Sequence, residues 1–147
     1  MILHAGLIAL RAQQRWLGAL ITGPSGVGKT DLMLRALEAG FGLVADDRTI
    51  VWPSDGRLYG RAPGPLAGLL EARGLGLERR VALPVARVRL VVVCERDPAA
   101  VERLPEPAFE TIEGVKVAAL KLCPLEASAP AKLAHALLRL GWGPGAA

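Results

Sequence analysis

The sequence predicts an α/β fold in which a mixed sheet is flanked by helices around a glycine-rich, phosphate-loop-type (P-loop) segment. Short apolar runs typical of strands alternate with segments of helical periodicity. A glycine-rich stretch at 23–30 stands between a predicted strand and a predicted helix. The segment Val88–Cys94, which contains the apolar run Leu90–Cys94, is typical of a central strand. The 147 residues suit one domain, expected over 1–140 and followed by a flexible tail over 141–147.

Composition excludes several classes of protein. Hydrophobic residues make up 52% of the chain and charged residues 22%, so disorder over most of its length is excluded. No apolar run is long enough for a membrane span, no signal peptide is visible, and the two cysteines lie far apart, so we expect a cytoplasmic protein without a membrane partner. The net charge is +4, but the arginines are dispersed and aromatic residues make up 4%, so we expect no nucleic-acid partner.

The first elements are a predicted hairpin and a helix. Strands over Leu3–Leu10 and Leu17–Thr22 are joined by the polar turn Arg11–Arg15. A helix follows over Lys29–Ala39, and Gly40 stands where a C-terminal cap belongs. Its apolar side is expected to comprise Leu32, Leu34, Ala36 and Leu37.

The middle of the chain predicts a buried strand, a second hairpin and a short helix. The strand Leu43–Ala45 ends at two aspartates. The turn Pro53–Gly56 is flanked by strands at Thr49–Trp52 and Leu58–Tyr59. Residues 66–71 read as a short helix (Leu66–Glu71) that is stopped by Gly74.

The last third predicts a helical turn, a strand pair and a final helix. Pro98–Leu104 is expected to form one or two helical turns, and the strands Phe109–Ile112 and Val115–Leu120 flank Gly114. Ser128 is a suitable N-cap for the last helix. The apolar side of that helix is expected to comprise Leu133, Leu137, Leu138 and Leu140.

Residues 23–30 follow the full phosphate-loop pattern G-x-x-x-x-G-K-[ST]. They are Gly23, Pro24, Ser25, Gly26, Val27, Gly28, Lys29 and Thr30. The glycines permit backbone angles at which successive N–H groups point at a phosphate, and the helix that follows adds its positive N-terminal end. Lys29 can reach the β and γ phosphates and Thr30 can offer a hydroxyl to Mg²⁺, so the motif predicts a nucleotide site.

Asp46 and Asp47 are the next candidates because they follow the strand that comes directly after the loop helix. One carboxylate can hold Mg²⁺, and the other can accept a proton from an attacking hydroxyl. The alternative is a solvated turn after a strand.

Two further groups are weaker signals when taken alone. Glu71 and Arg73, followed by Gly74, would address different partners such as a metal and a phosphate. The alternative interpretation is a helix end with a glycine stop. A lone histidine in a strand, such as His4, is usually structural.

Taken together, these segments resemble the catalytic domain of HPr kinase/phosphorylase over about residues 3–93. The matching segments are His4-Ala5, the loop Gly23–Thr30, Val44–Arg48, Ala62-Pro63 and Leu69–Gly76. The resemblance implies a nucleotide core like that of phosphoenolpyruvate carboxykinase, the use of ATP and Mg²⁺, and a homo-oligomer that is often a hexamer. It implies phosphorylation of a serine of an HPr-type phosphocarrier of the phosphotransferase system, which many members reverse by phosphorolysis.

The resemblance also implies residue roles. Lys29 matches the phosphate-loop lysine, and Thr30, Glu71 and Asp46 match positions at or near the metal. Asp47 matches the proton acceptor of the kinase direction and the donor of the reverse one. His4 matches a histidine that supports this aspartate, and Arg73 lies in a signature segment implicated in catalysis.

The sequence departs from the family pattern at three places, and the third favours kinase over phosphorylase activity. His4 stands almost at the start, as in short α-proteobacterial forms without an N-terminal domain. Ala72 replaces the usual Ile, and no later basic catalytic loop is recognisable after Val93. A small-molecule kinase and a non-catalytic nucleotide-sensing module remain alternatives, and the carrier could belong to the sugar or the nitrogen system.

Overall fold

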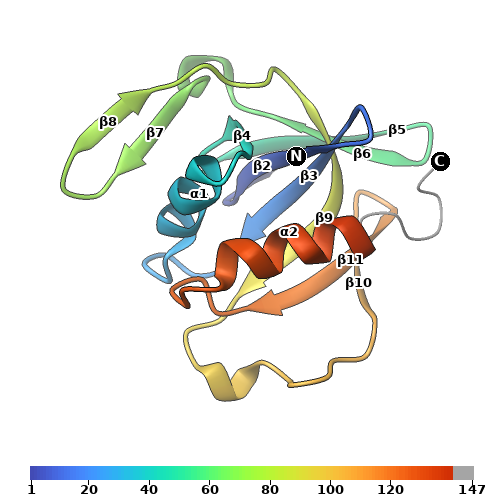
Figure 1. Ribbon diagram of the computed structural model, residues 1–147. Helices are drawn as coiled ribbons and strands as arrows, with labels where there is room; N and C mark the ends of the chain where they lie inside the picture. The colour runs from blue at the N-terminus through green and yellow to red at the C-terminus, as the bar shows by residue number, and fades with distance from the viewer. Residues whose placement is uncertain (141–147) are drawn as a thin grey trace.

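The computed structural model describes residues 1–140 as a curled mixed sheet with two α-helices on one face (Figure 1). The helices are α1 (Lys29–Glu38) and α2 (Ala129–Leu140). The strands of the large sheet are β1 (Ile2–Leu3), β2 (Gly6–Ala12), β3 (Arg15–Thr22), β4 (Gly42–Ala45), β5 (Thr49–Ser54), β6 (Arg57–Arg61), β9 (Ala86–Cys94), β10 (Ala108–Ile112) and β11 (Val115–Leu122). The predicted α/β class with a mixed sheet and flanking helices is confirmed.

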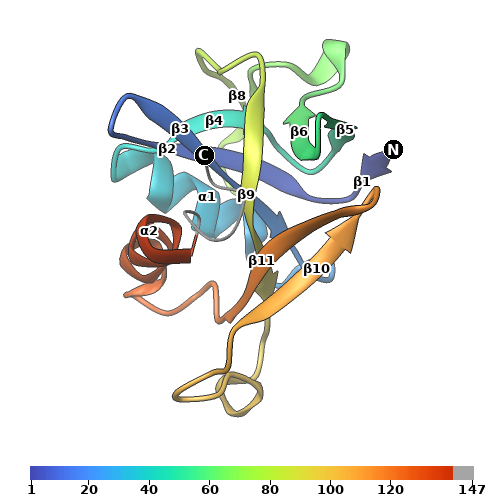
Figure 2. The ribbon, with the colours of Figure 1, turned by 90° about the vertical axis from the view of Figure 1, so that its right-hand side faces the viewer.

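Strand β9 is the centre of the sheet, as its apolar sequence predicts. Its first residues pair antiparallel with β6, and its later residues pair parallel with β3 on one side and β11 on the other. The path of the sheet is β1-β5-β6-β9-β3-β2-β4, and β10 continues it beyond β11. Because β9 changes partners along its length, the sheet bends around this strand (Figure 2).

The two faces of the sheet bury two apolar clusters. The cluster beneath the helices includes Leu32, Met33, Leu90 and Leu133, and the cluster on the other face includes Leu58 and Val91. Two details of the helix predictions change. Met33 is buried whereas Leu34 is only partly so, and Leu138 is exposed, so its predicted place on the apolar side is wrong. The side chain of Leu140 lies outside the described part.

The first hairpin is tighter and more interrupted than predicted. Its turn consists only of Gln13 and Gln14, both with positive φ (50° and 63°). The predicted strand Leu3–Leu10 is broken at His4-Ala5, and the hydroxyl of Thr49 donates to the carbonyl oxygen of Ala5 at 2.8 Å. This break releases His4 from the regular pleat.

The predicted helix Leu66–Glu71 is wrong. A single 3₁₀ turn at Gly64–Leu66 is followed by the hairpin of β7 (Leu69–Ala72) and β8 (Gly76–Arg79). Gly68, at φ +76°, interrupts helical geometry, and the alternation of burial along β7 follows the two-residue period of a strand. The hairpin projects beside α1 (Figure 1).

Three smaller predictions concern the helical turns at residues 98–104, the start of the last helix and the C-terminal tail. The helical turns predicted at Pro98–Leu104 reduce to a 3₁₀ helix at Pro98–Ala100, whose first turn donates to Asp97. The last helix begins directly after Ser128, as predicted. The predicted tail 141–147 lies outside the described residues.

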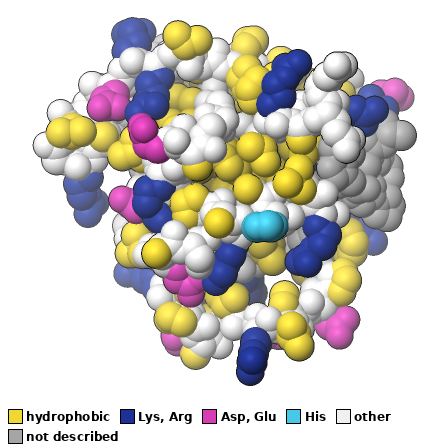
Figure 3. Space-filling model, in the orientation of Figure 1, with side chains coloured by type: hydrophobic (Ala, Val, Ile, Leu, Met, Phe, Trp, Pro, Cys, Tyr) yellow, Lys and Arg dark blue, Asp and Glu magenta, His cyan; other side chains and the backbone are white. Residues whose placement is uncertain are grey.

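The distribution of surface charge and the length of the helices relate to the predictions about nucleic-acid and membrane partners. On the face drawn in Figure 3, Lys and Arg side chains are scattered among neutral and hydrophobic ones and form no continuous stripe. Within residues 1–140, no helix is both long and apolar enough to cross a membrane.

Candidate functional site

The glycine-rich loop connects β3 to α1 and leaves the start of the helix open. Gly23, Gly26 and Gly28 have φ of 144°, 79° and 111°. Gly28 stands at the N-cap, and no side chain in the described part of the chain caps the helix. The N–H groups of the first turn therefore lack a side-chain acceptor, which is the arrangement that suits a phosphate.

Lys29 folds back over the loop. Its ammonium group donates to the carbonyl oxygens of Gly23 at 2.6 Å and Pro24 at 3.0 Å. An ammonium group has three N–H bonds, so one more can be directed to a ligand above the loop. The guanidinium of Arg96 donates to the carbonyl oxygen of Ser25 at 2.9 Å and supports the loop from the outside. Sequence reasoning missed Arg96, although β3 and β9 are parallel and so end at the same edge of the sheet.

Asp46 is buried at the end of β4 and joins three elements. One carboxylate oxygen accepts a hydrogen bond from the Thr30 hydroxyl at 3.1 Å, and the other accepts from the backbone N–H of Glu71 at 3.0 Å. The residue as a whole is only 9% exposed. Burial raises the pKa of Asp46, and the two hydrogen bonds oppose this shift.

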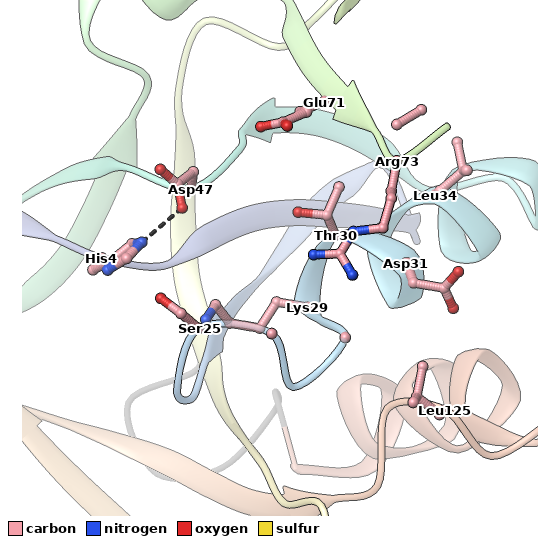
Figure 4. Close-up of a pocket in the computed structure, with 13 residues that line it drawn as sticks. His4, Ser25, Lys29, Thr30, Asp31, Leu34, Asp47, Glu71, Arg73 and Leu125 are labelled. Carbon is pink, nitrogen blue, oxygen red and sulfur yellow. Dashed lines mark hydrogen bonds and ion pairs between the residues drawn. The ribbon is translucent and has the colours of Figure 1, made fainter. Parts of the chain in front are cut away.

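Asp47 has the opposite environment. Its side chain is 58% exposed, and its carboxylate lies 2.7 Å from Nε2 of His4, as Figure 4 shows. Its φ of +66° is unusual for a residue with a side chain and turns this carboxylate away from that of Asp46. The two neighbouring aspartates are therefore directed to different tasks.

These groups surround one pocket of about 550 Å³. The lining residues come from the N-terminal segment, the loop and α1, the end of β4, the β7–β8 hairpin and the β11–α2 connection: His4, Ser25, Gly26, Gly28, Lys29, Thr30, Asp31, Leu34, Asp47, Glu71, Ala72, Arg73 and Leu125. The pocket thus brings together most of the residues predicted from sequence. Of the others, Gly23 and Pro24 accept hydrogen bonds from Lys29 through their carbonyl oxygens, Val27 is buried beneath the loop, and Asp46 lies behind Thr30.

Sequence reasoning missed Asp31, Leu34 and Leu125. Asp31 and Leu34 follow the motif on a single helix face, so the motif could have pointed to them. Leu125 carries no sequence signal, because only the packing of the β11–α2 connection against Gly28 brings it to the pocket.

The oxygen atoms near Thr30 fit a hard cation such as Mg²⁺. In residues 1–140 there is no group of three or more His, Cys, Asp or Glu side chains placed to hold a metal by themselves. The Thr30 hydroxyl donates a hydrogen bond to Asp46, which leaves the lone pairs of the hydroxyl oxygen for a ligand, and the Glu71 side chain lines the same pocket. Hydroxyl and carboxylate oxygens are the ligands that Mg²⁺ accepts, usually together with water and substrate phosphates.

Comparison with known proteins gives a consistent result. Residues 3–128 match the family described as HPr Serine kinase C-terminal domain. The chain is 41% identical to the HPr kinase/phosphorylase of Leptothrix cholodnii over 117 residues, which cover 69% of this chain and 35% of that protein. It is 50% identical to the HPr kinase/phosphorylase of Lacticaseibacillus casei over 62 residues, which cover 42% of this chain and 19% of that protein. The chain thus spans about a third or less of the length of these relatives.

A solved structure shares the fold. The HPr(Ser) kinase/phosphatase of Coxiella burnetii superimposes with a TM-score of 0.76, covering 95% of this chain and 94% of that chain. The sequence identity of this pair is 22%, so the likeness supports the architecture.

Proposed function

The chain belongs to the HPr serine kinase C-terminal domain family, and on that premise we propose that it is an ATP-dependent protein-serine kinase that acts on an HPr-type phosphocarrier. One observation carries the proposal beyond family membership. The His4–Asp47 pair, at 2.7 Å, faces the same pocket as Lys29 and the uncapped start of α1. A proton acceptor and a phosphate cradle in one pocket are the two parts that phosphoryl transfer to a hydroxyl requires.

The proposed binding step uses the backbone of residues 23–30. The N–H groups of the loop and of the first turn of α1 hold the phosphates of ATP, and Lys29 neutralises charge on the transferred group. Arg73, which lines the pocket from the β7–β8 turn, supplies a second cation near the phosphates.

The proposed chemical step uses Asp47 as general base. Its carboxylate takes the proton of the acceptor serine as the serine oxygen bonds to the γ-phosphorus and the bond to the β–γ bridging oxygen breaks, which releases ADP. His4 orients the Asp47 carboxylate through the 2.7 Å contact. The high exposure of Asp47 suits an acceptor that is itself a protein, because its serine must approach from outside.

The proposed metal site is formed by Thr30 and Glu71, with Asp46 behind Thr30. Asp46 accepts a hydrogen bond from the Thr30 hydroxyl and thereby directs the lone pairs of the hydroxyl oxygen to the pocket. Mg²⁺ bound there would neutralise phosphate charge and align the leaving group.

The test is a transfer assay with purified chain, Mg-ATP and either the sugar-system or the nitrogen-system carrier. We expect an acid-stable phosphoserine on one carrier. Asp47→Asn should lose several powers of ten in rate, because its amide cannot accept the proton, while ATP binding persists. Lys29→Ala should lose a similar factor. An acid-labile phosphohistidine, transfer only to a metabolite, or near-normal rates in both variants would contradict the proposal.

Three finer features go with the proposal. Reversal would use inorganic phosphate to attack the phosphoserine, with protonated Asp47 returning its proton to the serine oxygen and pyrophosphate as product. Pyrophosphate release from the phosphorylated carrier measures this reaction. We also propose a phosphoenolpyruvate carboxykinase-like nucleotide core in a cytoplasmic homo-oligomer. Sedimentation of the purified chain distinguishes a hexamer from smaller assemblies.

A further inference from the structure

We propose that Leu125 and Leu34 form an apolar subsite that receives the nucleoside part of the bound nucleotide. The inference rests on the proposed function and deepens it, because it assigns the end of the pocket that holds no catalytic group. Leu125 is 67% exposed, lines the pocket and lies beside the start of the loop helix.

The position of Leu125 is built into the fold. A Cβ placed on Gly28 would lie 2.8 Å from a methyl carbon of Leu125, so the leucine packs directly on the loop backbone. The connection that carries it is held by Arg35 of α1, whose guanidinium donates to the carbonyl oxygens of Pro124 and, at 3.0 Å, Glu126. The same guanidinium binds the carboxylate of Asp31 at 3.0 Å. Leu125 is therefore fixed over the pocket by both flanking residues.

The pocket has two chemically different ends. In Figure 4, His4 and Asp47 lie at one end, and Lys29 and the guanidinium of Arg73 lie in the middle. Leu34 and Leu125 lie at the other end, with the carboxylate of Asp31 between them. The transferred phosphoryl group must lie near Asp47, because this carboxylate is the proposed proton acceptor. The rest of the nucleotide then extends past Lys29 and along the first turns of α1, towards the two leucines.

The chemistry of this end suits a base or sugar and does not suit a phosphate. Leu34 is partly buried on α1, and with Leu125 it offers aliphatic surface that a flat aromatic base can cover. Covering Leu125 on ligand binding would remove its exposed area from water.

The experiment compares ATP with inorganic tripolyphosphate, which has the phosphates but no nucleoside. Calorimetric titrations of the full chain with each ligand in the presence of Mg²⁺ would be run for the wild type, Leu125→Ala and Leu104→Ala. Leu104 is 88% exposed and does not line the pocket, so it is the matched control. We expect Leu125→Ala to bind ATP about tenfold more weakly and to bind tripolyphosphate as the wild type does.

Each other outcome overturns the inference. Unchanged ATP affinity in Leu125→Ala would show that the leucine does not touch the nucleoside. An equal loss for ATP and tripolyphosphate would show that it only supports the phosphate loop. A wild type that binds neither ligand would overturn the proposed function together with this subsite, whereas the first two outcomes leave the kinase assignment intact.

Discussion

At the scale of single residues, the two neighbouring aspartates show how backbone geometry separates their environments. The positive φ of Asp47 sends its carboxylate to His4 and the open pocket, while Asp46 turns into the interior against Thr30 and Glu71. A buried carboxylate loses hydration, so its charged form is disfavoured. Asp46 is therefore expected to affect stability, whereas Asp47 is expected to affect the reaction.

The first prediction concerns the pH dependence that Asp46 confers. Burial raises the pKa of Asp46 in the folded protein, so the unfolded chain releases this proton at lower pH than the folded one. The stabilising contribution of the protonated form is present below the ordinary carboxyl pKa and is lost as pH rises through the raised pKa. The difference in free energy of unfolding between wild type and Asp46→Asn should therefore fall as the pH rises from the ordinary carboxyl pKa, about 4, through the raised pKa of the folded protein.

Urea unfolding at a series of pH values measures this difference. Asp46→Ala removes both hydrogen-bond acceptors, so it should be less stable than Asp46→Asn at every pH. Parallel stability curves for wild type and Asp46→Asn would contradict the raised pKa.

The residues of the site differ in how far sequence could predict them. Lys29 and Thr30 follow from the loop motif alone, and the structure places both in the pocket. The pairing of His4 with Asp47 came only from the family resemblance, because nothing local links residues 43 positions apart. Arg96 and Leu125 were missed because their positions depend on how strands distant in sequence end side by side.

At the scale of elements, the β7–β8 hairpin carries part of the site. The chain enters this hairpin at Gly68, which we call the pivot. Its base is closed by a hydrogen bond from the Arg80 N–H to the Gly68 carbonyl oxygen at 2.7 Å. From this base the hairpin brings the Glu71 N–H to Asp46 and Arg73 to the pocket. The hairpin thus adds Glu71 and Arg73 to the pocket that Lys29 and Thr30 also line.

The second prediction tests this pivot. A Cβ on Gly68 would lie 2.7 Å from the Arg80 carbonyl oxygen, and its φ of +76° disfavours any side chain. Gly68→Ala should therefore lower the free energy of unfolding by about 1–3 kcal/mol and slow phosphotransfer as well. Gly64→Ala is the matched control, because a Cβ there meets no atom within 4 Å. Equal stability of the two variants in denaturant titrations would refute the strained pivot.

The same hairpin explains why its sequence was misread as a helix. The apolar residues around Leu66–Leu70 are too few to distinguish a period of two from one of 3.6, and Gly74 fits either a helix stop or a turn. The decisive feature is the turn at Gly68, which separates the 3₁₀ segment from β7. In contrast, α1 was predicted well because the sequence carries a strong signal for the C-terminal end of this helix. Phe41 and Gly40 N–H groups bond to the Ala36 and Leu37 carbonyl oxygens, the pattern of a glycine-terminated helix.

At the scale of the whole molecule, β9 is the strand on which both cores depend. Leu90 packs in the cluster beneath the helices and Val91 in the cluster on the opposite face. The apolar run predicted the central position of β9, and the structure confirms it. The sequence could not show which strands pair with it, because β3, β6 and β11 lie far from it along the chain and pairing is set by packing.

The third prediction follows from this shared strand. Leu90→Ala should lower the free energy of unfolding by about 2–5 kcal/mol, because it leaves a cavity beneath the helices. The exposed Leu104, as Leu104→Ala, should change it by less than about 0.5 kcal/mol.

Two probes on different faces show whether the loss extends across the sheet. Far-ultraviolet circular dichroism reports the helices, and fluorescence reports Trp16 and Trp52 when Trp142 is replaced by Phe in every variant. Trp16 packs against the cluster opposite the helices, and Trp52 stacks on Tyr59 with ring centroids 6.1 Å apart. Because β9 contributes to both clusters, the transition midpoints of the two probes should fall together in Leu90→Ala. A fluorescence midpoint that stays at the wild-type value while the helical signal shifts would show that the two faces unfold independently.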